Sequence, residues 1–326
     1  MKKINRICVI DSIYSLLIYL LLSKEKTEST YFYWSNGIPS KIREHFRGQS
    51  YFFNKELKNN KVRTLYSIYL YFIAPLKWPF LKNNNSIEYW GHDHLFFSTA
   101  IIRNHKYNII EDGLLNYQQN KIKRIYSYTK ELPFMPLYTK HSYPGDSKNC
   151  KAIYLTGIVN SAIMNNPKTK QISIQKLWNN LPIPEKEKIL NIFNLTLEKI
   201  NTIKTKTSIL ITQPFDEDKI LTEEEKIKLY QNIIKNINSS NLIIKPHPRE
   251  RTNYHSFFPH IPIFDSYIPF QLLSLCEIVF NDVYTICSTA AYDFPYPTTI
   301  HFIGSQIHPN ILNRFPTLTK ENFKKV

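Results

Sequence analysis

The chain has 326 residues, of which 43% are hydrophobic and 14% aromatic, so it can form two domains with ordinary cores and is not a disordered polypeptide. Its four cysteines are scattered and form no C-x-x-C pair, which argues against a disulfide framework and a structural zinc site. Its seven glycines form neither a P-loop nor a Gly-x-Gly-x-x-Gly pattern, which argues against a glycine-rich nucleotide loop. The net charge is +16, and residues 1–130 carry 20 Lys/Arg against 9 Asp/Glu, a balance that favours polyanionic partners.

A strand followed by a helix is predicted near the start of the sequence. Ile7–Ile10 is predicted to be the first strand, and Ile13–Leu22 the helix that follows it. The apolar run after Lys2, Lys3 and Arg6 also admits a signal peptide, but Asp11 interrupts it and no small-residue cleavage site follows. The run is too short to span a bilayer.

Strands and helices continue to alternate through the first half. Strands are expected near Ile7, Tyr31, Ile87 and Asn108, and helices near Ile13, Leu65 and Leu95. The segment Leu76–Lys82 mixes aromatic residues with lysines, as interfacial membrane contacts do. A solvated basic face beside a buried tryptophan is the alternative.

A connection is expected before residue 200. Leu181-Pro-Ile-Pro184 and a helix-like run over Glu185–Ile200 precede the second half, so the predicted domains are 1–200 and 201–326. In the second half we expect strands at 208–212, 242–244, 278–280 and 299–303, and helices after Thr222, over 270–276 and after Ser288. Repeated strand–helix–strand units predict two Rossmann-like α/β domains with parallel sheets.

His247 is the leading candidate for a site residue. It follows the strand at 242–244 in the sequence Lys-Pro-His-Pro-Arg, and the prolines end the strand abruptly. Ligands bind beyond the carboxyl ends of strands in open α/β sheets, and Arg249 offers a planar fork of donors to a phosphate. The alternative is a rigid loop with a solvated histidine.

Two acidic motifs also follow predicted strands. Glu111-Asp112-Gly113 delivers two carboxylates onto a glycine turn, where one could accept a proton from a substrate hydroxyl; an ordinary Asp-Gly turn is the alternative. Gln213–Asp218 contains Asp216 and Asp218, whose spacing could hold a divalent metal; a solvated acidic loop before a helix N-terminus is the other interpretation.

Two further motifs carry polar groups at strand ends. Ser288 and Thr289 could begin a helix whose free amides bind phosphate, or could simply cap that helix. His92 and His94, with Asp93 between them, could ligate a metal, although this spacing is weak evidence and Asp93 is a natural N-cap. We predict no metal site.

The order of these motifs along the chain resembles that of the bacterial sialyltransferases of glycosyltransferase family 52, the lipooligosaccharide and capsule enzymes. The motifs run Gly-His-Asp-His, Glu-Asp-Gly, Gln-Pro-x-Asp, His-Pro-Arg and Ser-Thr-Ala-Ala, from the first strand to about residue 304. The resemblance implies a GT-B architecture, with two Rossmann-like domains facing each other across a cleft. It also implies that residues 201–326 hold the donor, CMP-sialic acid, that residues 1–200 form the acceptor side, and that neither metal nor cofactor is needed.

The resemblance also implies roles for individual residues. His247 would protonate or stabilise the departing CMP phosphate, and Ser288 and Thr289 would bind it. Relatives place the catalytic aspartate in either of two motifs, so Asp112 and Asp216 both remain candidates for the general base. Four neighbouring residues are expected to contact substrate or nucleotide: Glu111, Gly113, Pro248 and Arg249.

The sequence therefore predicts an inverting sialyltransferase acting on a terminal galactose-type sugar of a surface glycolipid or oligosaccharide. We expect it in the cytoplasm, peripheral on the anionic inner membrane, and a homodimer is compatible with the sequence. A GT-B transferase using CMP-Kdo or a UDP-sugar is the alternative enzyme. A non-catalytic protein that binds nucleic acid or anionic membrane is the alternative of another class; no recognised nucleic-acid motif supports it, and we predict no nucleic-acid partner.

Overall fold

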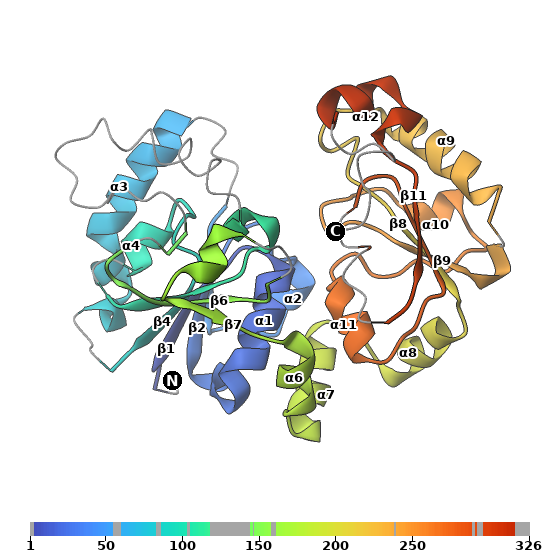
Figure 1. The fold of residues 1–326 in the computed structure, drawn as a ribbon. Coiled ribbons are helices and arrows are strands. Elements are labelled where there is room, and N and C mark those ends of the chain that lie inside the picture. Colours follow the sequence, from blue (N-terminus) through green and yellow to red (C-terminus); the bar gives the residue numbers. More distant parts are fainter. Residues whose placement is uncertain are drawn as a thin grey trace. The chain divides into compact units, whose positions relative to one another are not determined.

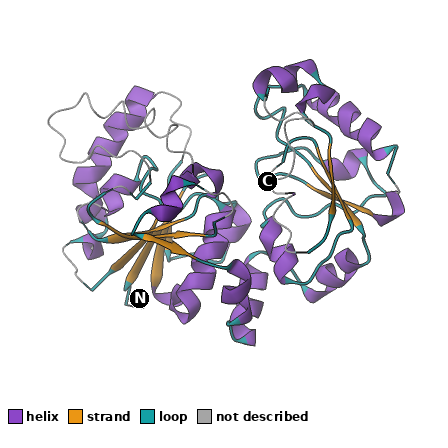
Figure 2. Ribbon diagram, viewed as in Figure 1, coloured by secondary structure: helices purple, strands orange, loops and turns teal. Residues whose placement is uncertain are grey.

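The chain divides into two compact units, Met1–Ile189 and Leu190–Val326. The structure is a computed structural model, and it describes residues 3–54, 60–82, 86–102, 105–117, 144–145, 147–157, 161–237, 239–288, 291 and 296–316. The division falls inside a helix, eleven residues before the boundary predicted after residue 200. Each unit has strands at its centre and helices around them (Figures 1 and 2).

The first unit is built on a seven-stranded parallel sheet of order β3-β2-β1-β4-β5-β6-β7. Its strands are β1 (Arg6–Val9), β2 (Thr30–Trp34), β3 (Ser50–Phe52), β4 (Glu88–Gly91), β5 (Tyr107–Ile110), β6 (Cys150–Leu155) and β7 (Thr169–Gln171). Its helices are α1 (Ile13–Ser23), α2 (Ser40–Glu44), α3 (Asn60–Lys77), α4 (Ser98–Ile102), α6 (Ile174–Asn179) and α7 (Ile183–Ile192), the last of which reaches the second unit. The central strands β1 and β4 are mostly apolar and buried, apart from the exposed Glu88, as is usual for a parallel sheet between layers of helices.

The second unit contains a four-stranded parallel sheet of order β11-β10-β8-β9. Its strands are β8 (Ser208–Ile211), β9 (Leu242–Lys245), β10 (Asp282–Thr285) and β11 (Thr299–Phe302). Its helices are α8 (Leu197–Lys204), α9 (Glu223–Ile234), α10 (Tyr254–Phe257), α11 (Phe270–Leu275) and α12 (Pro309–Arg314). Thr222 caps α9 in the predicted capping box with Glu225.

Two element predictions are wrong. Ile278–Phe280 is not a strand, because Tyr296 and Thr298 donate side-chain hydrogen bonds to the carbonyls of Ile278 and Phe280, and sheet pairing begins only at Asp282. The predicted helical run over 185–200 is two helices, broken where Asn194 adopts a left-handed backbone (φ 51°) and Thr196 starts α8. The helix expected after Ser288 lies mostly outside the described residues.

Among the described residues, no helix is both long enough and apolar enough to cross a bilayer.

Candidate active site

The first cluster of polar side chains lies at the carboxyl edge of the first sheet. Strands β1, β4, β5 and β6 are consecutive neighbours in that sheet. The loops directly after them supply Ser12, His92, Asp112 and Thr156. Since ligands of open α/β sheets bind beyond this edge, the location agrees with a functional site.

Glu111 anchors this edge. Its carboxylate is fully buried and accepts hydrogen bonds from Tyr14, Tyr117 and both the backbone N–H and the hydroxyl of Thr156. Burial raises the pKa of Glu111, and these hydrogen bonds partly oppose the rise. With its oxygens occupied, Glu111 holds the loops after β5 and β6 together and leaves the reactive position to its neighbour.

Asp112 is the accessible carboxylate of the motif, with 21% of its side chain exposed. His94 Nε2 lies 3.2 Å from Asp112 Oδ2, and His92 Nδ1 lies 3.7 Å from the same oxygen. Burial acts to raise the pKa of Asp112, but the two imidazoles and the Ser12 hydroxyl outweigh it and hold the pKa well below its usual range. Gly113 follows with φ 58°, a backbone conformation that favours glycine.

Hydrogen bonding fixes the tautomer of His92. The Ser15 hydroxyl donates to the backbone oxygen of Glu111 (2.6 Å), so it accepts from His92 Nε2 (2.9 Å). The proton of neutral His92 is therefore on Nε2. The charged ring carries a second proton on Nδ1, toward Asp112, and this charged form is the one that lowers the pKa of Asp112. Burial lowers the pKa of His92, which favours the neutral form, although Asp112 opposes the shift. Among the described residues, Nδ1 has no hydrogen-bond partner.

The trio of His92, His94 and Asp112 can accept one positive charge. One atom from each residue lies within 4.8 Å of the others, so the group could hold a transition-metal ion as well as a proton. Gly91 makes this geometry possible, because a Cβ at its position (φ 116°) would lie 2.0 Å from the Val9 carbonyl oxygen. The close approach of β4 to β1 also lets His92 N donate to that oxygen (2.6 Å).

The second cluster lies at the carboxyl edge of the second sheet. Thr285, Ile211 and Lys245 are in register at the ends of β10, β8 and β9. Ser288 follows β10 and His247 follows β9, and β8 lies between these two strands, so their axes are about 10 Å apart at this edge. Ser288 N donates to Thr285 Oγ1 (2.9 Å). Thr289 lies outside the described residues.

His247 is held in one orientation by its own loop. Arg249 N donates to His247 Nδ1 (3.2 Å), and His247 N donates to Glu250 Oε2 (2.6 Å). Because Nδ1 accepts, the proton of the neutral ring is on Nε2, which remains a donor for a ligand. Burial and, after it, the positive charges of Arg249 and Lys245 together lower the pKa of His247 to about 4.

The two exposed residues beside His247 differ in what they contact. Arg249 forms a two-pronged ion pair with Asp218 (2.6 and 2.9 Å), which raises the pKa of the guanidinium. It would have to leave Asp218 to bind a phosphate. Pro248 is exposed between His247 and Arg249 and fixes the turn.

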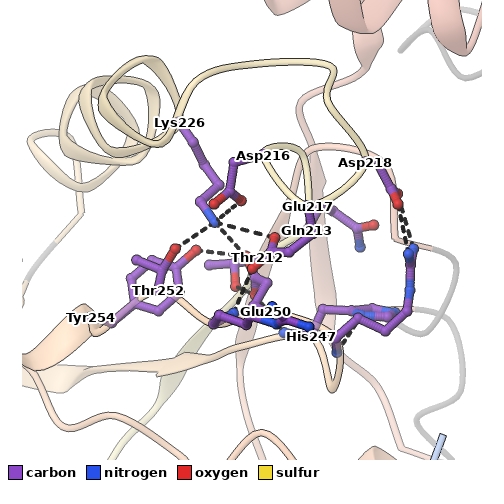
Figure 3. A network of polar contacts seen from close by, with 12 residues as sticks. Thr212, Gln213, Asp216, Glu217, Asp218, Lys226, His247, Glu250, Thr252 and Tyr254 are labelled. Atoms are coloured by element: carbon purple, nitrogen blue, oxygen red, sulfur yellow. Dashed lines mark hydrogen bonds and ion pairs between the residues drawn. The ribbon is translucent and has the colours of Figure 1, made fainter. Parts of the chain in front are cut away.

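The buried ammonium of Lys226 contacts residues of the loops after β8 and β9. Lys226 on α9 has a fully buried side chain that donates to Asp216 and to Thr252 Oγ1 (2.7 Å), and its Nζ lies 3.5 Å from Glu250 Oε1 (Figure 3). Glu250 in turn accepts from the hydroxyls of Thr212 (2.5 Å) and Tyr254 (2.7 Å). Asp216 is thus committed to an internal ion pair.

Sequence reasoning missed the supporting residues Lys226 and Glu250. A signal for Lys226 existed, because it shares one helix face with Tyr230 and Ile234 and is buried with them. A charged residue in an apolar row must find an internal partner. Glu250 left no comparable signal, since its role depends on how the loop after β9 folds back on β8.

The low pKa of His247 leads to a prediction for folding stability. Its folded pKa of about 4 is below the ordinary value of 6.5, so the unfolded chain binds the proton first. The stabilising contribution is complete above pH 6.5 and is lost as pH falls toward 4. We expect denaturant unfolding to show a steeper loss of stability over this range for the wild type than for His247→Gln. Parallel losses in the two proteins would contradict a desolvated His247.

The chain is similar to known proteins over most of its length. The sequence model of glycosyltransferase family 52 matches residues 18–310. An uncharacterized protein of Haemophilus influenzae is 33% identical over 322 residues, which cover 97% of this chain and 99% of that protein.

Solved structures share the fold at low identity. A 2,6-sialyltransferase of Photobacterium sp., solved with CMP and lactose, has a TM-score of 0.61 at 14% identity and covers 98% of this chain and 77% of that one. The GT-B domain of a Photobacterium damselae sialyltransferase has a TM-score of 0.56 at 14% identity, with 91% and 90% covered. A UDP-N-acetylglucosamine 2-epimerase of Listeria monocytogenes reaches 0.51 at 10% identity, with 97% and 88% covered. The predicted GT-B fold class is confirmed, and the chain belongs to glycosyltransferase family 52.

Proposed function

We propose that this protein transfers sialic acid from CMP-sialic acid to a terminal galactose-type sugar of a bacterial surface glycan, with inversion at the anomeric carbon. Membership of family 52 supports the choice of a glycosyl transfer reaction. The fold alone does not select the donor, because a UDP-sugar epimerase shares it. Two structural neighbours are sialyltransferases, and one was solved with CMP and lactose, which favours this donor and an oligosaccharide or glycolipid acceptor.

The observation that carries the proposal is the orientation of His247. Its Nδ1 accepts from Arg249 N, so its Nε2–H is available as a donor beyond the end of β9. Negative charge grows on the phosphate as the sugar leaves, and a donor placed there stabilises the transition state more than the ground state. Ser288 follows a strand of the same edge and supplies a further polar group.

The reaction balances with the groups present. The acceptor oxygen forms a bond to the anomeric carbon as the bond from that carbon to the CMP phosphate oxygen breaks. The leaving phosphate keeps the electron pair and accepts a hydrogen bond from His247 Nε2–H. Asp112 removes the acceptor proton, and His94 and His92 adjoin the carboxylate that receives it. We assign the role of general base to Asp112 rather than Asp216, because Asp216 forms an ion pair with the buried ammonium of Lys226.

The test is transfer by the purified protein from CMP-sialic acid to lactose, followed as CMP release and as product mass. His247→Ala should lower kcat about 10²–10³-fold, the usual effect of losing one donor to developing charge. His260→Ala, an exposed histidine of the same unit, is the control and should leave kcat unchanged. His247→Gln should retain more activity than His247→Ala, because its amide can still donate.

Three further arms separate the alternatives. Product from CMP-Kdo or a UDP-sugar, with none from CMP-sialic acid, would assign another donor. EDTA should not reduce activity; a loss that a divalent transition metal restores would refute metal independence, and His92, His94 and Asp112 would be the group to examine for the ion. No CMP release above the His247→Ala level would defeat the proposal.

A further inference from the structure

His92, His94 and Asp112 have the donor spacing of a metal site. Asp112 Oδ2 lies 3.2 Å from His94 Nε2 and 3.7 Å from His92 Nδ1, and one donor atom from each residue lies within 4.8 Å of the others. Two ligands bound to the same Zn²⁺ at about 2.0–2.1 Å, with a tetrahedral angle between them, are about 3.3 Å apart. The two distances to Asp112 are close to this separation.

His92 directs a buried nitrogen toward this point. Its side chain is 1% exposed, and Nδ1 has no hydrogen-bond partner among the described residues, because 3.7 Å from Asp112 is too far for a hydrogen bond. The other nitrogen, Nε2, is bonded to the Ser15 hydroxyl (2.9 Å), so Nδ1 is the unprotonated nitrogen of the neutral ring. Metal-ligating histidines are commonly oriented by such a bond from the second ring nitrogen. A metal ion would supply the partner that Nδ1 lacks.

The other two side chains are held in place by their own contacts. The ring of His94 is stacked on that of His92, with centroids 5.1 Å apart, and its side chain is 9% exposed. The backbone N–H of Asp112 donates to the side-chain oxygen of the buried Asn116. The exposed 21% of the Asp112 side chain gives an ion a way in. The three ligands are therefore largely arranged before an ion binds, and they leave the fourth position of a tetrahedral ion to water.

The donor set indicates which class of ion would bind. Mg²⁺ and Ca²⁺ prefer oxygen ligands, whereas imidazole nitrogen suits Zn²⁺, Cu²⁺ and Ni²⁺. The sequence analysis predicted no metal site because it considered His92 and His94 together with Asp93. In the structure, Asp93 accepts hydrogen bonds from the Tyr107 hydroxyl and the Gly145 N–H, both at 2.9 Å. The third ligand comes instead from the loop after β5, which the spacing within one motif could not show.

We propose that His92, His94 and Asp112 bind one divalent transition-metal ion such as Zn²⁺, and that the bound ion inhibits sugar transfer. The ion occupies the carboxylate that removes the acceptor proton, so ion and acceptor compete for the same lone pair. Binding follows from the geometry alone, whereas inhibition rests on the proposed function, in which Asp112 is the general base. Transfer itself needs no metal, so the ion acts as a regulator and takes no part in the reaction.

The test of binding is titration of the untagged full chain with ZnCl₂, in the absence of donor and acceptor. Calorimetry should show a one-to-one Zn²⁺ complex, and no binding of Mg²⁺ at the same concentrations. His94→Gln and Asp112→Asn should each weaken Zn²⁺ binding at least about 100-fold, since each removes a ligand and the loss of an outer contact alone costs about 10–100-fold. His301→Gln is the matched control and should bind as the wild type does. His301 also pairs with an aspartate, Asp282 (2.7 Å), but belongs to no group of three metal-binding side chains among the described residues.

Absence of a one-to-one Zn²⁺ complex in the wild type, or undiminished binding by both ligand variants, would overturn the proposal. Titration of the wild type with CoCl₂ gives a check that does not depend on how the variants fold. Four-coordinate Co²⁺ absorbs visible light much more strongly than the hydrated ion, so a spectrum like that of the hydrated ion would also refute the site.

The test of inhibition is transfer to lactose by the wild type at free Zn²⁺ concentrations fixed with a chelator. Activity should fall by half near the measured Kd and should return when EDTA is added. Binding without inhibition would refute the regulatory role. A preparation that binds Zn²⁺ but shows no transfer even without it would contradict the proposed function and leave the metal site supported, so the two failures are distinguishable.

Discussion

Replacing Asp112 by Asn is expected to lower kcat for transfer to lactose about 10²–10⁴-fold, the usual contribution of a general base, while the protein remains folded. The side chain keeps its size and can still contact His94, but it can no longer take the acceptor proton. The low pKa of Asp112 belongs to the protein without substrate. We expect a bound acceptor to cover the 21% of the Asp112 side chain that is exposed, and this desolvation to raise the basicity of the carboxylate.

The chain offers a close control for that variant. Asp282 also pairs with a histidine, His301, at 2.7 Å, but at the amino end of β10 rather than at the site edge. Asp282→Asn should leave kcat unchanged, which separates loss of a general base from loss of an aspartate–histidine pair.

Asp216→Asn decides between the two candidate bases. Asp216 is bound to Lys226, so this variant should mainly affect stability and leave kcat for the folded protein close to the wild-type value. A folded Asp216→Asn without activity, alongside an active Asp112→Asn, would reverse the assignment.

Much of the fold could be predicted from the sequence because its strands are buried on both faces. The strands Arg6–Val9 and Leu242–Lys245 are fully buried, and apart from Arg6 and Lys245 they consist of short apolar runs, which the sequence shows directly. The sequence analysis missed three strands, β3, β6 and β7. Two of them, Ser50–Phe52 and Thr169–Gln171, have only three residues each and lie at the two edges of the sheet. Such strands form because a neighbouring strand offers free backbone groups, and little in their own composition indicates it.

The candidate site could be located from the sequence, but its internal contacts could not. Polar motifs directly after apolar runs correctly placed Asp112 and His247 at strand ends, because parallel sheets place such loops at one edge. The sequence did not show that Arg249 pairs with Asp218 or that Glu111 is enclosed by Tyr14, Tyr117 and Thr156. These contacts join residues up to 97 positions apart, and only the folded chain determines them.

Lys226→Met should destabilise the second unit by about 3–5 kcal/mol, the usual cost of removing one partner of a buried ion pair. The Lys226 ammonium is the cation beside Asp216 and Glu250, and the side chains of Lys226 and Glu250 are both fully buried. Lys228→Met is the control: its partner Glu224 is on the same helix, both side chains are at least 68% exposed, and such surface pairs contribute about 0–1 kcal/mol.

Hydrogen exchange of peptides from α9 and β9 under increasing urea measures the opening of this unit, since a chain with two units need not unfold in one step. The double variant Lys226→Met/Glu250→Gln removes the buried negative charge as well, and should recover part of the lost stability. If Lys226→Met costs no more than Lys228→Met, the ammonium does not hold the loop after β9. In that case the orientation of His247 must depend on the contacts of the loop itself, the bond from Arg249 N to Nδ1 above all.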